Sequence, residues 1–151
     1  MKDQTPGLFD ASAPQPKPEP SEIYRLEFDG ACEPNPGVMQ IGFVIRDPAG
    51  RIVSEVSRKL GDGTNNIAEY QALIHGLRAA LDLGIENLDV QGDSLIVVTA
   101  TNGRGKPIHK RHPNIQPLLR EVRALLPRFR HIEIRHVPRE FNTHADDLST
   151  A

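Results

Sequence analysis

After a proline-rich start, apolar and polar residues alternate in the way that is typical of β-strands. Over residues 23–28 every second residue from Tyr24 is apolar, which predicts a strand with one buried face. Residues 41–46 predict a second strand and residues 51–60 a third, with an Asp-Pro-Ala-Gly turn at 47–50. Because the connections are short, we expect these strands to form an antiparallel meander.

The spacing of apolar residues then changes to that of an amphipathic helix. A single apolar stripe predicts a helix over residues 66–83, which Gly84 ends. A helix at this point implies a right-handed crossover, so we expect an α/β fold with a mixed sheet and helices on both faces. The rest of the chain predicts a strand at 88–91, a helix from 93 or 94 to 101, a helix at 114–126, a strand at 131–137 and a final helix from 142.

Composition divides the chain into two parts. Five of the thirteen prolines lie in residues 1–21, which we expect to form a disordered, extended leader. The leader contains Leu8 and Phe9 after Gln4, which resembles a weak docking peptide for a sliding clamp, although the spacing is one residue too long. A plain tail is the alternative. Residues 22–151 are long enough for one domain with one core.

Bulk properties exclude several classes of protein. The sequence has no apolar run of about 18 residues, so we expect no membrane span, and its N-terminus does not resemble a secretory signal. Cys32 is the single cysteine and cannot form an internal disulfide, which fits a cytoplasmic location. The net charge of −2 excludes a globally basic surface, so local patches or cations must hold any nucleic acid.

Four acidic residues, far apart in sequence, are the candidates for chemistry, and each has a structural alternative. Asp29 precedes a glycine and fits a turn, whereas Glu69 fits the second half of a capping box. Asp93 fits a helix N-cap. Asp146 and Asp147 fit the first turn of a helix, where the macrodipole favours negative charge.

The predicted topology favours convergence of the four acids. Asp29 and Asp93 follow strands that we expect to be parallel neighbours, whose carboxyl ends lie side by side. Glu69 and Asp146 lie on the first turns of helices that can point to the same edge. Four clustered carboxylates require cations, and oxygen ligands at this density suit Mg²⁺ or Mn²⁺.

The surroundings of these acids resemble the type 1 ribonuclease H family. The resemblance covers residues 24–149, and four motifs in one order make it specific. It implies a ribonuclease H-like fold with a five-stranded sheet of order 3-2-1-4-5 in residues 22–151. The motifs are Asp29-Gly30-Ala31-Cys32 with Asn35-Pro36-Gly37, Thr64-Asn65-Asn66 with Ala68-Glu69-Tyr70, Asp93-Ser94, and Asn142 with Ala145-Asp146.

The resemblance implies a metal-dependent endoribonuclease that hydrolyses the RNA strand of an RNA–DNA hybrid. Such enzymes use two Mg²⁺ ions, with Mn²⁺ as a substitute, and leave 3′-hydroxyl and 5′-phosphate ends. By similarity, Asp29 bridges both ions and Asp146 helps to hold the ion that activates water. Glu69 and Asp93 help to hold the ion near the leaving oxygen. We expect a monomer.

The resemblance also implies substrate contacts by small, amide and basic side chains. Amides and glycine suit the 2′-hydroxyls and base edges of the minor groove, and a threonine at one matching position helps to bind a DNA phosphate. A tight loop or a helix cap is the alternative for several of these residues. The expected substrate-binding residues are Gly30, Asn35, Thr64, Asn65, Asn66 and Arg139.

Several positions depart from the family. His136 aligns with a mobile histidine of some relatives, but a strand-end or core role is the alternative. A basic loop at 103–113 stands where many relatives carry a basic handle, and Leu95 replaces a glutamine that contacts substrate. The chain also lacks tryptophan. A non-catalytic hybrid- or duplex-binding module, and a nuclease whose range includes double-stranded RNA, are the alternative functions.

Overall fold

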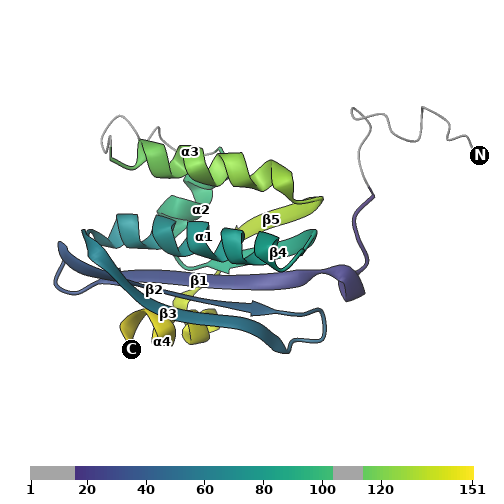
Figure 1. The fold of residues 1–151 in the computed structure, drawn as a ribbon, viewed down its shortest axis with the longest axis horizontal. Helices are drawn as coiled ribbons and strands as arrows, with labels where there is room; N and C mark the ends of the chain where they lie inside the picture. Colours follow the sequence, from purple (N-terminus) through teal and green to yellow (C-terminus); the bar gives the residue numbers. More distant parts are fainter. Residues whose placement is uncertain (1–15, 104–113) are drawn as a thin grey trace, which may run out of the picture.

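The computed structural model describes residues 16–103 and 114–151. Its centre is one sheet in which β1 and β4 are parallel neighbours, as are β4 and β5, while β1, β2 and β3 pair antiparallel. The strand order β3-β2-β1-β4-β5 confirms the predicted mixed sheet (Figure 1). The strands are β1 Tyr24–Cys32, β2 Gly37–Arg46, β3 Ile52–Gly63, β4 Asn87–Gly92 and β5 His131–His136.

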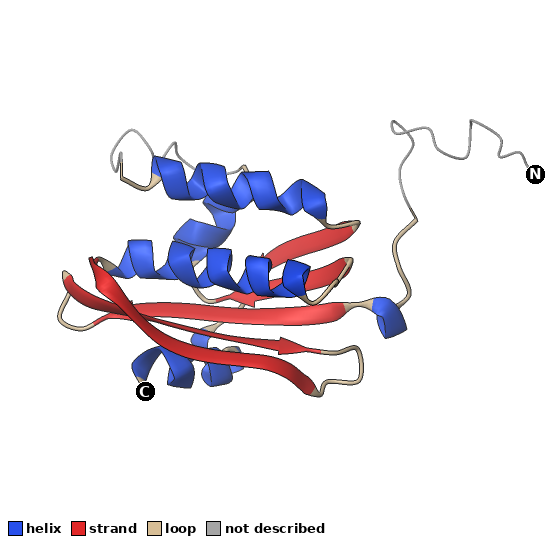
Figure 2. Ribbon diagram, viewed as in Figure 1, coloured by secondary structure: helices blue, strands red, loops and turns tan. Residues whose placement is uncertain are grey.

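Helices cover both faces of the sheet, as the topology predicted. Figures 1 and 2 show α1, α2 and α3 on one face and the short α4 on the other. Among the described residues, no helix combines the length and the apolar character needed to cross a bilayer. The helices are α1 Asn65–Asp82, α2 Leu95–Thr101, α3 Gln116–Leu125 and α4 Thr143–Thr150.

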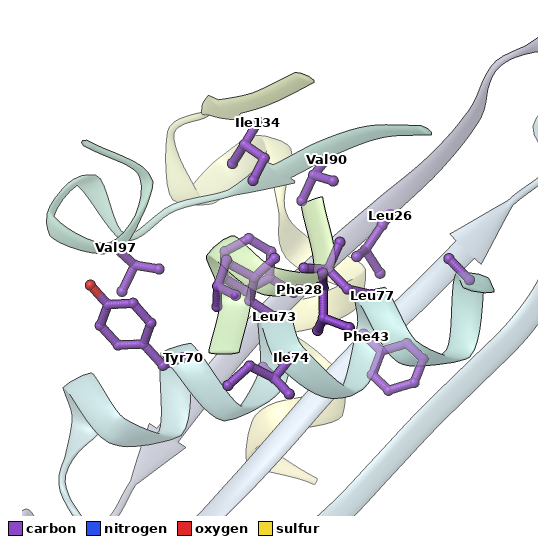
Figure 3. Packing of buried hydrophobic residues seen from close by; sticks show 14 of the residues in the cluster. Leu26, Phe28, Phe43, Tyr70, Leu73, Ile74, Leu77, Val90, Val97 and Ile134 are labelled. Atoms are coloured by element: carbon purple, nitrogen blue, oxygen red, sulfur yellow. The ribbon is translucent and has the colours of Figure 1, made fainter. Parts of the chain in front are cut away.

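The main core lies between the sheet and α1. Leu26 and Phe28 of β1 face Leu73 and Leu77 of α1, and all four are fully buried (Figure 3). Val90 of β4 extends the same layer. Burying a leucine or phenylalanine side chain contributes about 1.5–3 kcal/mol, so this contact fixes α1 firmly on the centre of the sheet.

The first strand is longer than its apolar pattern predicted. We expected it to end at Asp29, but β1 continues to Cys32 because β2 still pairs with it there. The pairing with β4 stops earlier, at Phe28 and Gly92. Beyond this point β1 has a neighbour on one side only, and the sheet is open beside Asp29.

The N-cap residues of two helices differ from those that the sequence predicted. Thr64 caps α1, since its hydroxyl accepts a hydrogen bond from the Ile67 amide at 3.3 Å. Ser94 caps α2 by accepting from the Val97 amide at 3.4 Å. The capping alternatives for Glu69 and Asp93 are therefore wrong, and both carboxylates are available for other contacts.

The predicted leader and basic loop lie largely outside the described residues. Residues 1–15, with the expected docking peptide, and residues 104–113 belong to neither described range. At the end of the leader, the Lys17 ammonium lies 3.5 Å from the Glu133 carboxylate, and Pro20–Glu22 form a single 3₁₀ turn.

Candidate active site

Three of the four predicted carboxylates come together at the open end of the sheet. Each of Asp29, Glu69 and Asp93 offers an oxygen that lies within 4.8 Å of the other two. Asp29 belongs to β1, Glu69 to the second turn of α1, and Asp93 follows β4 directly. Because β4 ends at Gly92, side chains from both layers can meet beside β1.

Gly30 brings α1 close enough for Glu69 to reach this cluster. A Cβ atom at Gly30 would lie 2.2 Å from the backbone carbonyl of Ala68, so only glycine permits the observed approach of β1 to α1. The Gly30 amide donates a hydrogen bond to Glu69 Oε2 at 3.2 Å. The same glycine therefore makes room for the helix and orients its carboxylate.

Asp146 approaches Asp29 from the opposite layer. It lies half-buried in the first turn of α4 and contributes to the raised pKa of Asp29, but it is not one of the three acids whose oxygens meet within 4.8 Å. Asn142 fixes the start of α4, since its Nδ2 donates to the Phe28 carbonyl at 2.9 Å. The neighbouring Asp147 is exposed. Of these two acids, Asp146 is the less exposed and the one that influences the pKa of Asp29, and its role as the fourth ligand stays a prediction.

The protein environment opposes negative charge in this cluster. Burial, followed by the charge of Asp93, raises the pKa of Asp29 from 3.8 to about 7. Burial and the neighbouring charge of Asp29 likewise raise the pKa of Glu69 well above its usual value. A divalent cation would reverse both effects, because it stabilises the carboxylate form.

Asp93 adds a second indication that the cluster fits a cation. Its Oδ2 atom is buried and has no hydrogen-bond partner among the described residues. The Arg139 Nε lies 3.5 Å away, and its side chain is 77% exposed. A buried carboxylate oxygen without a donor is costly, and a hard cation is the ligand that would satisfy it.

Most of the predicted substrate residues lie where the loop between β1 and β2 meets the start of α1. Asn65 Oδ1 accepts from the Cys32 amide at 2.8 Å, and Asn35 Oδ1 accepts from the Asn65 amide at 3.2 Å. These bonds and the Thr64 cap hold the loop together. Asn66 lies half-buried on the first turn of α1. Within residues 16–103 and 114–151, no hydrogen bond involves the Nδ2 atom of Asn35 or Asn65, so both donors can meet a ligand.

The structure places two further histidines, one at the end of β5 and one in α4. His136 is exposed at the end of β5, which agrees with a strand-end role. His144, one helical turn before Leu148, is partly buried between Arg46 and Glu55, and both contact its ring nitrogens. The two partners of His144 lie on β2 and β3, far from it in sequence.

One residue of the site was missed altogether. Ser149 is buried, and its hydroxyl lies 2.8 Å from Asp29 Oδ2. The available signal was its position three residues after Asp146, which places both on one side of α4.

This sheet, with its carboxylates gathered where β1 and β4 part, defines a ribonuclease H-like domain. Residues 27–151 match the family described as reverse transcriptase-like. The chain belongs to this family, and its relatives include type 1 ribonucleases H.

Relatives of known sequence support the same grouping. Ribonuclease HI of Halobacterium salinarum is 38% identical over 122 residues, which cover 81% of this chain and 60% of that protein. A bifunctional protein of Mycobacterium tuberculosis is 38% identical over 125 residues, which cover 82% of this chain and 34% of that protein. The chain thus spans less than two thirds of the length of these relatives.

Solved structures match the fold closely. The RNase H1 of Halobacterium salinarum superposes with a TM-score of 0.80 at 37% identity, covering 85% of this chain and 95% of that one. The N-terminal RNase H domain of the Mycobacterium tuberculosis protein also has a TM-score of 0.80 at 37% identity. The match covers 86% of this chain and 92% of that one. An RNase H1 isolated from compost was crystallised with an RNA/DNA hybrid. It has a TM-score of 0.74 at 30% identity, and the match covers 85% of this chain and 93% of that one.

Proposed function

We propose that this protein is an endoribonuclease that hydrolyses the RNA strand of RNA–DNA hybrids, leaving 3′-hydroxyl and 5′-phosphate ends. The observation that carries the proposal is the meeting of Asp29, Glu69 and Asp93 within 4.8 Å at the open end of the sheet. The likeness to an RNase H1 crystallised with an RNA/DNA hybrid supports the choice of substrate. In a protein that only binds nucleic acid, clustered acids would lower the affinity, because they repel the phosphates of the ligand.

The carboxylates are proposed to hold two Mg²⁺ ions, for which Mn²⁺ can substitute. Asp29 is the central ligand, since Glu69 and Asp93 approach it from one side and Asp146 from the other. Bound divalent cations supply Lewis-acid activation of water and stabilisation of the leaving oxygen. The protein itself then contributes orientation: Gly30 directs Glu69, and Asn142 fixes the helix that carries Asp146.

The loop between β1 and β2 and the start of α1 are proposed to meet the minor groove of the hybrid. The Oδ1 atoms of Asn35 and Asn65 already accept backbone hydrogen bonds, which fixes both amide groups in place. Their Nδ2 donors can then bind 2′-hydroxyls and base edges, the groups that distinguish RNA from DNA. Gly30, Thr64 and Asn66 complete this surface in our proposal.

Arg139 is proposed to contact a phosphate of the hybrid. Its side chain is 77% exposed and lies beside Asp93, at the edge of the carboxylate cluster. A guanidinium group in this position can pair with a phosphate oxygen while keeping its place near the site.

Cleavage of labelled substrates tests the proposed function. With Mg²⁺ present, the chain should cut a hybrid within its RNA strand and leave double-stranded DNA intact. Asp29→Asn should lower the cleavage rate on the order of a thousandfold, since the removed ligand supports several kcal/mol of transition-state stabilisation. The matched control is Asp147→Asn, which removes an exposed acid from α4 and should keep near-normal activity.

Two results would contradict the proposal. Equal cleavage rates for the wild-type chain and Asp29→Asn would show that the Asp29 carboxylate takes no part in the reaction. Tight binding of the hybrid with no cutting in Mg²⁺ or Mn²⁺ would identify a binding module instead. Efficient cutting of double-stranded RNA would widen the substrate class.

A further inference from the structure

Ser149 lies where α4 packs closely against β2. It is 2% exposed, and a Cβ atom added to Gly42 of β2 would come within 2.6 Å of the Ser149 backbone nitrogen. The preceding carbonyl, that of Leu148, accepts hydrogen bonds from Gln40 Nε2 at 2.9 Å and from the Ser57 hydroxyl at 2.7 Å. The Ser149 side chain is therefore held in one place by its surroundings.

The Ser149 hydroxyl has two acceptors within reach but only one proton to donate. Asp29 Oδ2 lies 2.8 Å away and the Asp146 carbonyl 2.9 Å away. The Asp146 carbonyl already accepts from the Thr150 hydroxyl at 3.0 Å. A hydrogen bond to a carboxylate is also roughly twice as strong as one to a neutral acceptor. The proton therefore goes to Asp29 whenever Asp29 is ionised.

We propose that Ser149 is a positioning residue, which fixes the Asp29 carboxylate in the orientation that receives divalent cations. A carboxylate oxygen has two lone pairs, so Oδ2 can accept from Ser149 and still bind a cation. Asp29 also offers an oxygen within 4.8 Å of Glu69 and Asp93, so fixing its carboxylate fixes the arrangement of all three acids. The consequence for catalysis rests on the proposed function.

The same hydrogen bond couples two acids that come from opposite ends of the chain. Ser149 and Asp146 share one turn of α4, while Asp29 lies 120 residues before Ser149. Any shift of α4 that moves Asp146 also moves the donor that orients Asp29. The hydrogen bond thereby maintains the relative positions of the Asp29 and Asp146 carboxylates.

The test compares Ser149→Ala with Thr150→Ala in the full chain. Thr150 is a matched control, because its hydroxyl is exposed and its hydrogen bonds to the part of the chain that the structure describes are to carbonyls of α4. Calorimetric titration of the metal-free protein with Mn²⁺ should show about tenfold weaker binding for Ser149→Ala, the effect of one hydrogen bond to a charged group. The Mg²⁺ concentration for half-maximal cleavage should rise by a similar factor, with an unchanged KM for the hybrid and an unchanged melting temperature.

The possible outcomes separate the inference from the proposed function. Wild-type Mn²⁺ affinity in Ser149→Ala would overturn the positioning role, whether or not the chain cuts hybrids. Equal losses in Ser149→Ala and Thr150→Ala would also overturn it, because the effect would then belong to α4 as a whole. If the wild-type chain fails to cut hybrids, the proposed function falls while the calorimetry still decides the role of Ser149. Should Ser149→Ala melt early, Ser149→Cys keeps a weak donor, and an intermediate affinity for Mn²⁺ is then the expected result.

Discussion

At the scale of single residues, Asp29 shows how the site depends on a bound cation. The side chain is 5% exposed and faces other acids, so its charge is poorly solvated in the metal-free protein. Burial and Asp93 raise its pKa to about 7, while the Ser149 hydroxyl acts in the opposite direction. The metal-free protein therefore bears an unfavourable charge at neutral pH, which affects its stability.

The stability of the metal-free protein should fall as the pH rises from about 4 to about 7. In this range the unfolded chain has already released the Asp29 proton, whereas the folded protein still holds it, since the folded pKa is raised from 3.8 to about 7. The folded state binds more protons, so the free energy of unfolding decreases with pH, and Asp29 contributes at most about 4 kcal/mol to that decrease. Urea unfolding at a series of pH values, in the presence of a chelator, measures the change.

Asp29→Asn is the variant that isolates this effect. It removes the titrating group but keeps the shape of the side chain. The free energy of unfolding should therefore decrease less between pH 4 and 7, and the variant should be more stable than wild type at pH 7.5. Asp147→Asn should leave the profile unchanged, because Asp147 is exposed. A wild-type slope in Asp29→Asn would show that another group dominates the titration.

Sequence identified the acids of the site but not the groups that orient them. Asp29, Glu69 and Asp93 could be predicted because each follows a strand or begins a helix within a distinctive motif. The partners of Ser149 and Asn142 could not, since each bonds to β1 across more than 110 residues, as the separations of 120 and 114 show. A hydroxyl or an amide at a helix end has many possible partners, and only tertiary packing selects one.

At the scale of elements, α4 depends on the sheet for its structure. A helix of eight residues is unstable in isolation, because too few hydrogen bonds repay its nucleation. The contacts of Gln40 and Ser57 with the Leu148 carbonyl, and of Arg46 and Glu55 with His144, hold it on β2 and β3. Its position, and therefore that of Asp146, is set by how closely it can approach β2.

Gly42→Ala should push α4 away from the sheet and impair the site. The added Cβ would lie 2.6 Å from Leu148 Cβ and 2.7 Å from the Ala145 carbonyl, closer than atoms can approach. We expect a loss of about 1–3 kcal/mol in the free energy of unfolding, as for other overpacked contacts. Hybrid cleavage should fall more than tenfold, because Asp146 and Ser149 move together. Urea unfolding and single-turnover cleavage measure the two effects.

Gly61→Ala provides the control for this change. A Cβ atom at Gly61 would meet nothing within 4 Å, and the residue lies on β3 away from α4. Its stability and activity should stay close to those of the wild-type chain. A Gly42→Ala protein with normal cleavage would show that the approach of α4 does not control the site.

The elements themselves were predictable, and the errors fell at their ends. Apolar patterns and turn residues located every strand of the sheet, although buried side chains alternate strictly only along β4 of the three central strands, whereas β1 and β2 have continuous buried runs. The apolar pattern placed the end of β1 at Asp29, three residues before Cys32, where the strand ends. Pairing with β2 extends the strand through Gly30, and a local pattern carries no information about a partner strand.

At the scale of the whole molecule, the open end of the sheet lets two layers meet. Asp29 projects to the α4 face, while Glu69 comes from α1 on the opposite face. Elsewhere in the sheet, neighbouring strands separate such side chains. Because the pairing of β1 with β4 stops at Phe28, acids from both faces gather there, in a chain whose net charge is already −2. A bound cation would attract the carboxylates from both faces of the sheet and so stabilise this arrangement.

Divalent cations should therefore stabilise the folded protein, and should do so more at high pH than at low pH. At 100 times its Kd, a ligand that binds only the folded state adds about 2.7 kcal/mol, which corresponds to a rise of roughly 5–10 °C in melting temperature for a chain of this size. At pH 8 Asp29 is ionised and should bind Mn²⁺. At pH 4 the raised pKa values keep Asp29 and Glu69 protonated, so a cation must displace protons and the rise should vanish.

Thermal unfolding with MnCl₂, compared with NaCl at equal ionic strength, separates specific binding from screening. The wild-type chain should show the rise at pH 8 with MnCl₂ alone. Asp29→Asn should show little or none, because the central carboxylate is missing. A rise of equal size at pH 4, or in Asp29→Asn, would place the bound cation elsewhere on the surface. The pH dependence is the decisive part, since only a site whose own acids are protonated at pH 4 loses its cation there.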